Sequence, residues 1–379
     1  MYRGVFMKKA VSFALCFALI FLSCVFSADA VATSAQAHIL MDADTGVVLS
    51  GTNETQRIKM ASTTKIMTAL LALEEAQKKD AIVTFGEDMI AEGSSMYLKV
   101  GDKLHLSDLA AGMMMASGND AANAVALYMG KSFEDFAKLM NLRAESVGMK
   151  NTNFVTPSGL DDEEHFSTAY DMALLMAEAV KNESFRELSA STEKKVEFVY
   201  PEGKVTTYAN HNRLLKLYKY CTGGKTGFTE AAGRCLVSSA EKDGVTLIAV
   251  TLNAPDDWND HKALYEYGFS LYTNVEFDNR DAPFTIRLSG GETDFASASV
   301  GEKVSVSVPA NRIKDIEQKV YLPSFVFAPV KKGDVVGKIT YSLDNVELAS
   351  VYIKATTVVK ARPQPNFIMR LITAIFSKE

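Results

Sequence analysis

Apolar and polar positions repeat with two different periods along this chain of 379 residues, and the change comes near residue 275. Before that point, six segments carry apolar residues at every third or fourth position, which is typical of helices with one buried face. We expect these helices at 62–76, 106–115, from 120 onward, 133–147, 169–180 and 256–272. Shorter apolar runs predict strands at 37–42, 47–49, 193–200, 204–208, 219–228, 234–240 and 245–252. Strands at both ends with helices between them indicate an α/β fold of the α+β type, an antiparallel sheet flanked by helices, over residues 31–275.

After residue 275 the period becomes two. Segments 284–288, 304–308, 338–343 and 351–353 alternate apolar and polar residues, and pairs such as Gly290 and Gly291 separate them as turns. We therefore expect a second, all-β domain over residues 276–362. It shows no cluster of residues with catalytic chemistry, so we interpret it as a scaffold or spacer.

Each end of the chain carries a segment of its own. Arg3, Lys8 and Lys9, then an apolar run over 10–28, predict a signal peptide over 1–30 that is cleaved after Ala30. An uncleaved N-terminal anchor and a lipid attached at Cys24 are the alternatives, and all three place the protein outside the cytoplasm, on the cell-wall side of the membrane.

The last segment, 363–379, begins with two prolines and continues as a predicted helix with a wide apolar face. It is too short to span a bilayer, which favours an anchor lying in the plane of the membrane surface. The alternative is a helix docked on the β domain. The apolar face consists of Phe367, Ile368, Leu371, Ile372, Ile375 and Phe376.

Composition excludes several classes of function. With 47% hydrophobic and 23% charged residues the chain resembles an ordinary globular protein, and its net charge of −6 argues against nucleic-acid binding. The five histidines show no metal-ligand spacing, so neither a metal nor another cofactor is expected. Outside the first 30 residues the only cysteines are Cys221 and Cys235. A hairpin over 221–240 would hold them apart, which predicts two free thiols.

The candidate chemistry begins at Ser62 and Lys65. Residues three apart lie on the same face of a helix, so the Ser62 hydroxyl and the Lys65 amine should be neighbours. We also expect Ser62 or Thr63 to cap this helix. The apolar run around Lys65 would bury its amine and lower its pKa, which would allow Lys65 to act as the base for a Ser62 nucleophile.

Two further motifs complete a serine acyl-transfer pattern when they follow in this order. Ser117 and Asn119 lie at a break between two helices, where Ser117 can pass a proton to a leaving group and Asn119 can hold a substrate peptide bond. Lys225, Thr226 and Gly227 lie in a strand. There Lys225 and Thr226 can bind a substrate carboxylate, and Gly227 leaves room for the substrate beside the strand.

An oxyanion needs N–H donors that are already in place. We expect these donors to be the backbone N–H groups of Ser62 and Phe228. Catalytic residues Ser62, Lys65 and Ser117 and substrate-binding residues Asn119, Lys225, Thr226, Gly227 and Phe228 then form one candidate site.

With these motifs the chain resembles the low-molecular-mass penicillin-binding proteins of the serine D-alanyl-D-alanine carboxypeptidase family over about residues 35–275. The resemblance implies a β-lactamase-like fold and an acyl-enzyme at Ser62. It also implies peptidoglycan stem peptides as substrate and β-lactams as acylating inhibitors. It extends to the runs Asp42-x-Asp44-Thr45-Gly46, Gly93-Ser94-Ser95-Met96, Asn119-Asp120-Ala121, Met140-Asn141, Gly148-Met149, Ser158-Gly159-Leu160 and Asn212-Arg213-Leu214-Leu215.

Two other functions compete with a carboxypeptidase. A β-lactamase needs a carboxylate for deacylation, and the acidic run 161–164 is the only cluster in a suitable region. A cell-wall scaffold with weak or no catalysis is the second alternative. The acidic run resembles a solvated loop, and the β domain and terminal anchor suit a cell-wall enzyme better than a β-lactamase. The presence of all three motifs argues against the scaffold.

Overall fold

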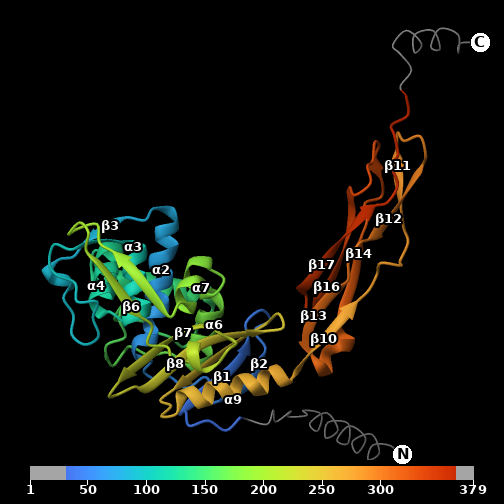
Figure 1. Cartoon of the computed structure of the whole chain (residues 1–379). Coiled ribbons are helices and arrows are strands. Elements are labelled where there is room, and N and C mark those ends of the chain that lie inside the picture. The colour runs from blue at the N-terminus through green and yellow to red at the C-terminus, as the bar shows by residue number, and fades with distance from the viewer. Residues whose placement is uncertain (1–30, 364–379) are drawn as a thin grey trace, which may run out of the picture.

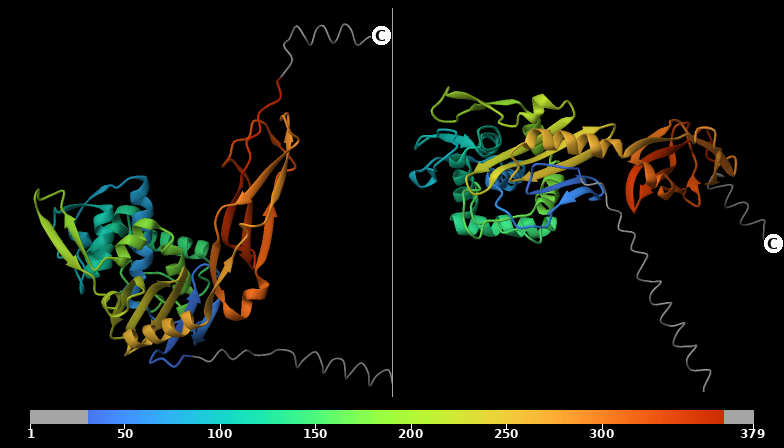
Figure 2. Two further views of the ribbon diagram at one scale, coloured as in Figure 1. Left: turned by 45° about the vertical axis from the view of Figure 1, so that its right-hand side comes forward. Right: turned by 90° about the horizontal axis from the view of Figure 1, so that it is seen from below.

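The computed structural model describes residues 31–363. The predicted signal peptide (1–30) and almost all of the predicted terminal segment (363–379) lie outside the described residues. Figures 1 and 2 show a helix-rich domain, which contains the candidate site and is called the catalytic domain from here on, and an elongated all-β domain, with helix α9 (Asp257–Ser270) leading from one to the other. No helix within the described part of the chain is both long and apolar enough to cross a bilayer.

The catalytic domain is built on a five-stranded antiparallel sheet with the order β2-β1-β9-β8-β7. Its central pairing joins the two ends of the domain, because Ile39 of β1 lies opposite Val250 of β9. Strand β7, which carries the Lys-Thr-Gly motif, is an edge strand, so one of its sides remains open. The strands are β1 (Ala37–Asp42), β2 (Val48–Thr52), β7 (Cys221–Thr229), β8 (Gly233–Lys242) and β9 (Val245–Leu252).

Successive residues of a strand point to opposite faces, and β1 shows how this sheet is covered on both. Ile39 and Met41 belong to the large core under the main group of helices, whereas Leu40 belongs to the core beneath α9. In Figure 1, α9 lies on the side of the sheet away from α2, α3 and α4. The main group comprises α2 (Lys65–Lys78), α3 (Leu106–Ala116), α4 (Asn119–Gly130), α5 (Phe133–Val147), α6 (Ala169–Ala179) and α7 (Glu183–Ala190).

Most predicted helices begin and end within two residues of the predicted positions, but the start of α2 differs. Ala61–Thr64 form a 3₁₀ turn, η1, and α2 begins at Lys65. The prediction that Ser62 or Thr63 caps the helix is wrong. Neither side chain bonds to an N–H group of the first turn, and the Thr63 hydroxyl donates to Met60 O at 2.6 Å instead.

Several short elements have no counterpart in the prediction. They are α7, α8 (Leu214–Leu217), η2 (Glu87–Met89) and the pair β3 (Ile82–Thr84) and β4 (Lys103–His105). The predicted pair at 193–200 and 204–208 is present as β5 (Glu193–Glu197) and β6 (Val205–Ala209).

The second domain is all-β, as its period of two predicts. Six strands form a sheet with the order β14-β16-β17-β12-β11-β15, and β10 pairs with β13 beside it. Because β10 begins at Tyr272, directly after α9, the expected boundary at residue 275 falls inside a strand. The elements are β10 (Tyr272–Phe277), β11 (Phe284–Ser289), β12 (Phe295–Val300), β13 (Val304–Pro309), η3 (Ala310–Asp315), β14 (Glu317–Tyr321), β15 (Val326–Phe327), β16 (Val335–Leu343) and β17 (Val346–Ala355).

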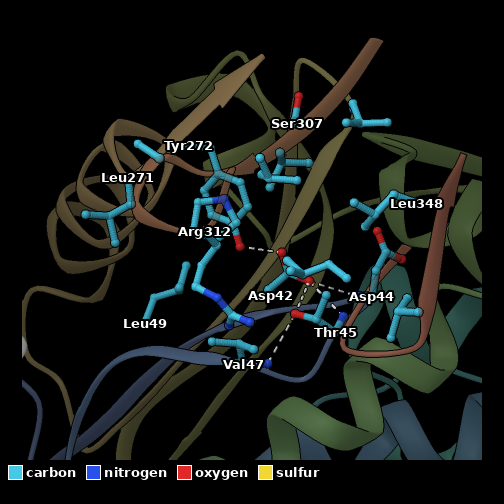
Figure 3. A pocket seen from close by; sticks show the side chains of 18 of the residues that line it. Asp42, Asp44, Thr45, Val47, Leu49, Leu271, Tyr272, Ser307, Arg312 and Leu348 are labelled. Atoms are coloured by element: carbon cyan, nitrogen blue, oxygen red, sulfur yellow. Dashed lines mark hydrogen bonds between the residues drawn. The ribbon is translucent and has the colours of Figure 1, made fainter. Parts of the chain in front are cut away.

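A groove of about 940 Å³ separates the two domains, and the turn after β1 forms its floor. Asp42 organises that turn, because one of its carboxylate oxygens accepts hydrogen bonds from Thr45 N and Thr45 Oγ1, both at 2.8 Å. Its other oxygen accepts from the Tyr272 hydroxyl at the start of β10 (Figure 3). This contact joins the start of the β domain to the end of strand β1 in the catalytic sheet.

We expect Tyr272→Phe to destabilise the catalytic domain by about 1.5 kcal/mol, because a buried carboxylate loses a charge-assisted hydrogen bond. Urea unfolding followed by fluorescence of Trp258, the single tryptophan, measures the change. Tyr267→Phe is the matched control, since no hydrogen bond to its hydroxyl is present, and it should change stability by less than about 0.5 kcal/mol. Equal effects of the two variants would contradict a role for the Asp42 contact.

Candidate active site

The nucleophile candidate sits where η1 meets α2. Lys65 Nζ lies 2.8 Å from Ser62 Oγ, which confirms the predicted neighbourhood of the two groups. The backbone reaches this turn through Ala61, which has a φ of +48° and is buried. Lys65 is completely buried, whereas Ser62 stays partly exposed, so the hydroxyl can meet a substrate while the amine cannot.

Two other groups hold the Lys65 amine. Its Nζ lies 2.7 Å from Asn119 Oδ1 and 2.7 Å from the carbonyl oxygen of Ser158. A neutral amine has two N–H donors and one lone pair. It can therefore donate to these two oxygens and accept the Ser62 hydroxyl proton, which accounts for all three contacts. Burial and, second, the charge of Lys225 lower the pKa of Lys65 well below its ordinary value.

Ser117 and Asn119 come from the break between α3 and α4, as predicted. Ser117 ends α3 in the left-handed conformation, with a φ of +57°. Its hydroxyl accepts a hydrogen bond from Lys225 Nζ at 3.0 Å, and the structure shows none between Ser117 and Lys65. Asn119 donates its amide to Glu92 O at 2.7 Å while its oxygen holds Lys65. Asn119 thus connects the base to the loop between η2 and β4.

The edge strand β7 supplies the other wall of the site. Lys225 is buried and also donates to Thr226 O at 2.7 Å, and burial lowers its pKa to about 7. A Cβ at Gly227 would lie 3.0 Å from the backbone nitrogen of Ser62, which is tighter than ordinary contact, so glycine favours this close approach of β7 to η1. Phe228 is 65% exposed and lines the same pocket as Ser62.

The loop containing Ser158 is positioned by Gly159. This residue has a φ of +83°, and a Cβ there would lie 1.9 Å from Ala61 O. Beneath it, Thr64 Oγ1 and His165 Nε2 are 2.9 Å apart, and burial lowers the pKa of His165 to about 4. A neutral imidazole therefore supports the turn that carries Ser62. The sequence analysis assigned no role to His165.

Ser62, Ser117 and Thr226 line a pocket of about 360 Å³, and two arginines line it with them. The first is Arg213, and the second, Arg234, belongs to β8. Arg234 donates to both carboxylate oxygens of Asp257, at 2.7 and 2.9 Å, and its guanidinium lies 5.6 Å from the Trp258 ring centroid. Sequence reasoning missed Arg234 and Asp257. The register that places Arg234 opposite Phe228 is the signal that could have found them.

No carboxylate of the described residues hydrogen-bonds to Ser62 or Lys65. In the acidic run 161–164, Asp161 accepts from Thr229 Oγ1 at 3.0 Å. Nor do residues 31–363 contain a cluster of three or more histidine, cysteine, aspartate or glutamate side chains arranged to hold a metal ion. Cys221 and Cys235 are free thiols, and Cys235 lies opposite Gly227 on the neighbouring strand.

A serine beside a buried lysine, on a helix packed against an antiparallel sheet, defines a serine acyl-transfer enzyme. A family model described as D-alanyl-D-alanine carboxypeptidase matches residues 24–256, and one for the penicillin-binding protein 5 C-terminal domain matches residues 272–361. The chain belongs to the D-alanyl-D-alanine carboxypeptidase family and is a serine hydrolase. Members of this family act on peptidoglycan stem peptides and are acylated by β-lactams.

Individual relatives extend the match over both domains. The D-alanyl-D-alanine carboxypeptidase DacC of Escherichia coli is 37% identical, with 83% of this chain and 82% of the relative covered. DacF of Bacillus subtilis is 31% identical, and the match covers 89% of each chain. The crystal structure of penicillin binding protein 5 from Haemophilus influenzae matches with a TM-score of 0.61 at 28% identity, covering 87% of this chain and 98% of that one.

Gly159→Ala is expected to destabilise the catalytic domain by more than about 3 kcal/mol, because the new methyl group collides with Ala61 O and the left-handed backbone is strained. Gly203→Ala is the matched control. Its φ is +77° but its side chain would meet open space, so it should cost only about 1 kcal/mol. Thermal unfolding of both variants tests this, and equal losses would show that crowding at Ala61 is unimportant.

Proposed function

We propose that Ser62 is the nucleophile and Lys65 its general base in a D-alanyl-D-alanine carboxypeptidase. The observation that carries the proposal is the 2.8 Å contact between Ser62 Oγ and an amine that is fully buried. Burial favours the neutral amine, and a neutral amine can take the hydroxyl proton as the oxygen attacks the carbonyl carbon of the penultimate D-Ala.

Attack converts that carbonyl oxygen into an oxyanion, and the backbone N–H groups of Ser62 and Phe228 are the proposed donors to it. Collapse of the tetrahedral intermediate breaks the peptide bond. The terminal D-Ala leaves with a proton that Ser117 delivers to its nitrogen. The acyl chain stays on Ser62 until Lys65 takes a proton from water, which then releases the shortened stem.

The terminal carboxylate of the stem is assigned to Lys225 and Thr226. Below a pH of about 7 Lys225 is a cation, and its Nζ lies 3.0 Å from Ser117 Oγ. Its charge can bind the substrate carboxylate. The same charge lowers the pKa of Lys65. Asn119 is assigned to the substrate peptide bond as well as to Lys65, because its oxygen and nitrogen each retain capacity for a second hydrogen bond.

The protein is proposed to work on the cell-wall side of the membrane. Residues 1–30 would direct its export, and 363–379 would hold it at the membrane surface. The sequence patterns of both segments support this, as does a substrate that is part of the cell wall. The absence of hydrogen bonds between Ser62 or Lys65 and any described carboxylate favours the peptidase over a β-lactamase, which needs such a group for deacylation.

Ser62→Ala should abolish both D-Ala release from a peptide ending in Lys-D-Ala-D-Ala and covalent labelling by fluorescent penicillin, a loss of at least about 10³-fold. Ser146→Ala on α5, far from the pocket, is the control and should retain both activities. Labelling that survives in folded Ser62→Ala would exclude Ser62 as the nucleophile.

The pH dependence should show two opposing limbs. The Lys65 base is lost as pH falls through its lowered pKa, and the Lys225 cation is lost as pH rises through about 7. We therefore expect kcat/KM for the peptide to fall about tenfold per pH unit on the alkaline side. Lys225→Arg keeps its charge and should move that limb upward by more than about two units.

A peptide ending in D-alaninamide provides the control for this profile, because it has no terminal carboxylate for Lys225 to bind. Its kcat/KM should lack the alkaline limb that begins near pH 7. If both peptides decline together, Lys225 does not bind the carboxylate.

A further inference from the structure

Exposed apolar side chains gather at the end of the β domain that lies farther from the catalytic domain. We call this end the tip and define it as residues 287–295, 320–338 and 352–363. Strand register places these segments together, since Gly291 bridges to Ala361 and Val330 to Val359. The exposed large apolar residues of the tip are Phe295, Val320, Tyr321, Leu322, Phe325, Phe327, Val335, Tyr352 and Val358. Elsewhere in this domain only Ile313 is of this kind.

The backbone of the tip fixes which side chains face outward. Phe327 is 73% exposed, and its ring meets that of Phe325 edge-on, with the centroids 5.2 Å apart. Val326, between them, packs against the core of the domain. Residues two apart in an extended chain share a face, so the two rings form one outward apolar surface. Tyr321, Leu322 and Tyr352 line a hollow of about 470 Å³ close by.

The tip is basic although the whole chain has a net charge of −6. Seven cations and three carboxylates give it a net charge of +4. One of those carboxylates, Asp294, is already paired with Arg362 at 2.9 Å. Exposed aromatic rings among lysines and arginines match an anionic lipid surface, in which cations meet phosphates and rings enter the headgroup region. The cations are Arg287, Lys331, Lys332, Lys338, Lys354, Lys360 and Arg362.

The chain continues from this same end. Arg362 N donates to Gly290 O at 2.8 Å, so residue 363, the last that the structure describes, belongs to the tip (Figures 1 and 2). The sequence that follows it, 364–379, has the amphipathic pattern described above. A membrane that binds 364–379 would therefore be close to Phe325 and Phe327, because both belong to the same end of the domain. We propose that the tip is a lipid-contacting surface, with these two rings in the headgroup region and Lys331 and Lys332 facing anionic phosphates. The proposal extends the membrane location given above and is independent of the catalytic assignments.

The first experiment measures whether residue 327 enters the lipid headgroup region when the full chain binds vesicles. Phe327→Trp is made in a Trp258→Phe background, so that it is the only fluorophore of its type, and vesicles of phosphatidylcholine with phosphatidylglycerol and brominated lipid are added. We expect its emission to shift to the blue and to be quenched by the bromines. Ile90→Trp, at a similarly exposed position in the catalytic domain, should show neither change. An unchanged Phe327→Trp signal, whether the protein binds the vesicles or not, overturns the proposal.

A charge variant tests the electrostatic part in the full chain. Lys331→Gln with Lys332→Gln should weaken binding to the anionic vesicles roughly 25-fold, since each cation near such a surface contributes about fivefold. Lys78→Gln with Lys79→Gln, at the end of α2, is the matched control and should bind like the unaltered chain. Equal binding by both variants overturns the contribution of the tip cations.

Measuring D-Ala release from a soluble peptide distinguishes a failure of the lipid-contact proposal from a failure of the catalytic proposal. The tip substitutions lie in the other domain. Lys331→Gln with Lys332→Gln should therefore release D-Ala from the soluble peptide at the rate of the unaltered chain, and Phe327→Trp should do so at the rate of the Trp258→Phe chain in which it is made. Loss of lipid contact with D-Ala release intact is the expected result. An unaltered chain that contacts lipid through the tip but releases no D-Ala would leave the tip proposal standing and refute the catalytic one.

Discussion

The catalytic domain depends on keeping one lysine amine dry and close to a serine hydroxyl. Burying a lysine is unfavourable unless its polar atoms are satisfied, so the surrounding fold must fix every contact of Lys65. The turn η1 brings Ser62, α4 brings Asn119, and the loop at Ser158 brings a carbonyl oxygen, each within 2.8 Å of Lys65 Nζ. Three separate parts of the chain therefore converge on one atom, and distortion of any of them alters the base.

A second buried lysine, Lys225, helps to keep the Lys65 amine neutral. Lys225 and Lys65 have no carboxylate partner among their hydrogen bonds, and burial lowers the pKa of both. The positive charge on one disfavours protonation of the other. The site thus favours one protonated amine out of the two. Lys65, whose pKa is lowered more, stays neutral and can accept a proton, while Lys225 can stay charged and bind a substrate anion.

Much of this could be predicted from the sequence, because the informative signals are local. The spacing of Ser62 and Lys65 places them on one helix face whether the first turn is 3₁₀ or α, so the wrong capping prediction did not affect the site. Contacts between distant segments were not predictable in this way. Arg234 meets Asp257, and His165 supports Thr64, only because the sheet register and a long loop bring them together. Strands such as β14, exposed on both faces, lack the alternation that reveals β11.

The position of β1 in the sheet has a consequence for how the chain reaches its native state. Ile39 pairs with Val250, more than 200 residues later, so the central ladder cannot form until almost the whole catalytic domain is available. Folding that waits for such distant partners has a high contact order and is slow. The apolar residues of β1, Ile39 among them, therefore stay without their strand partners until the segment that forms β9 is available.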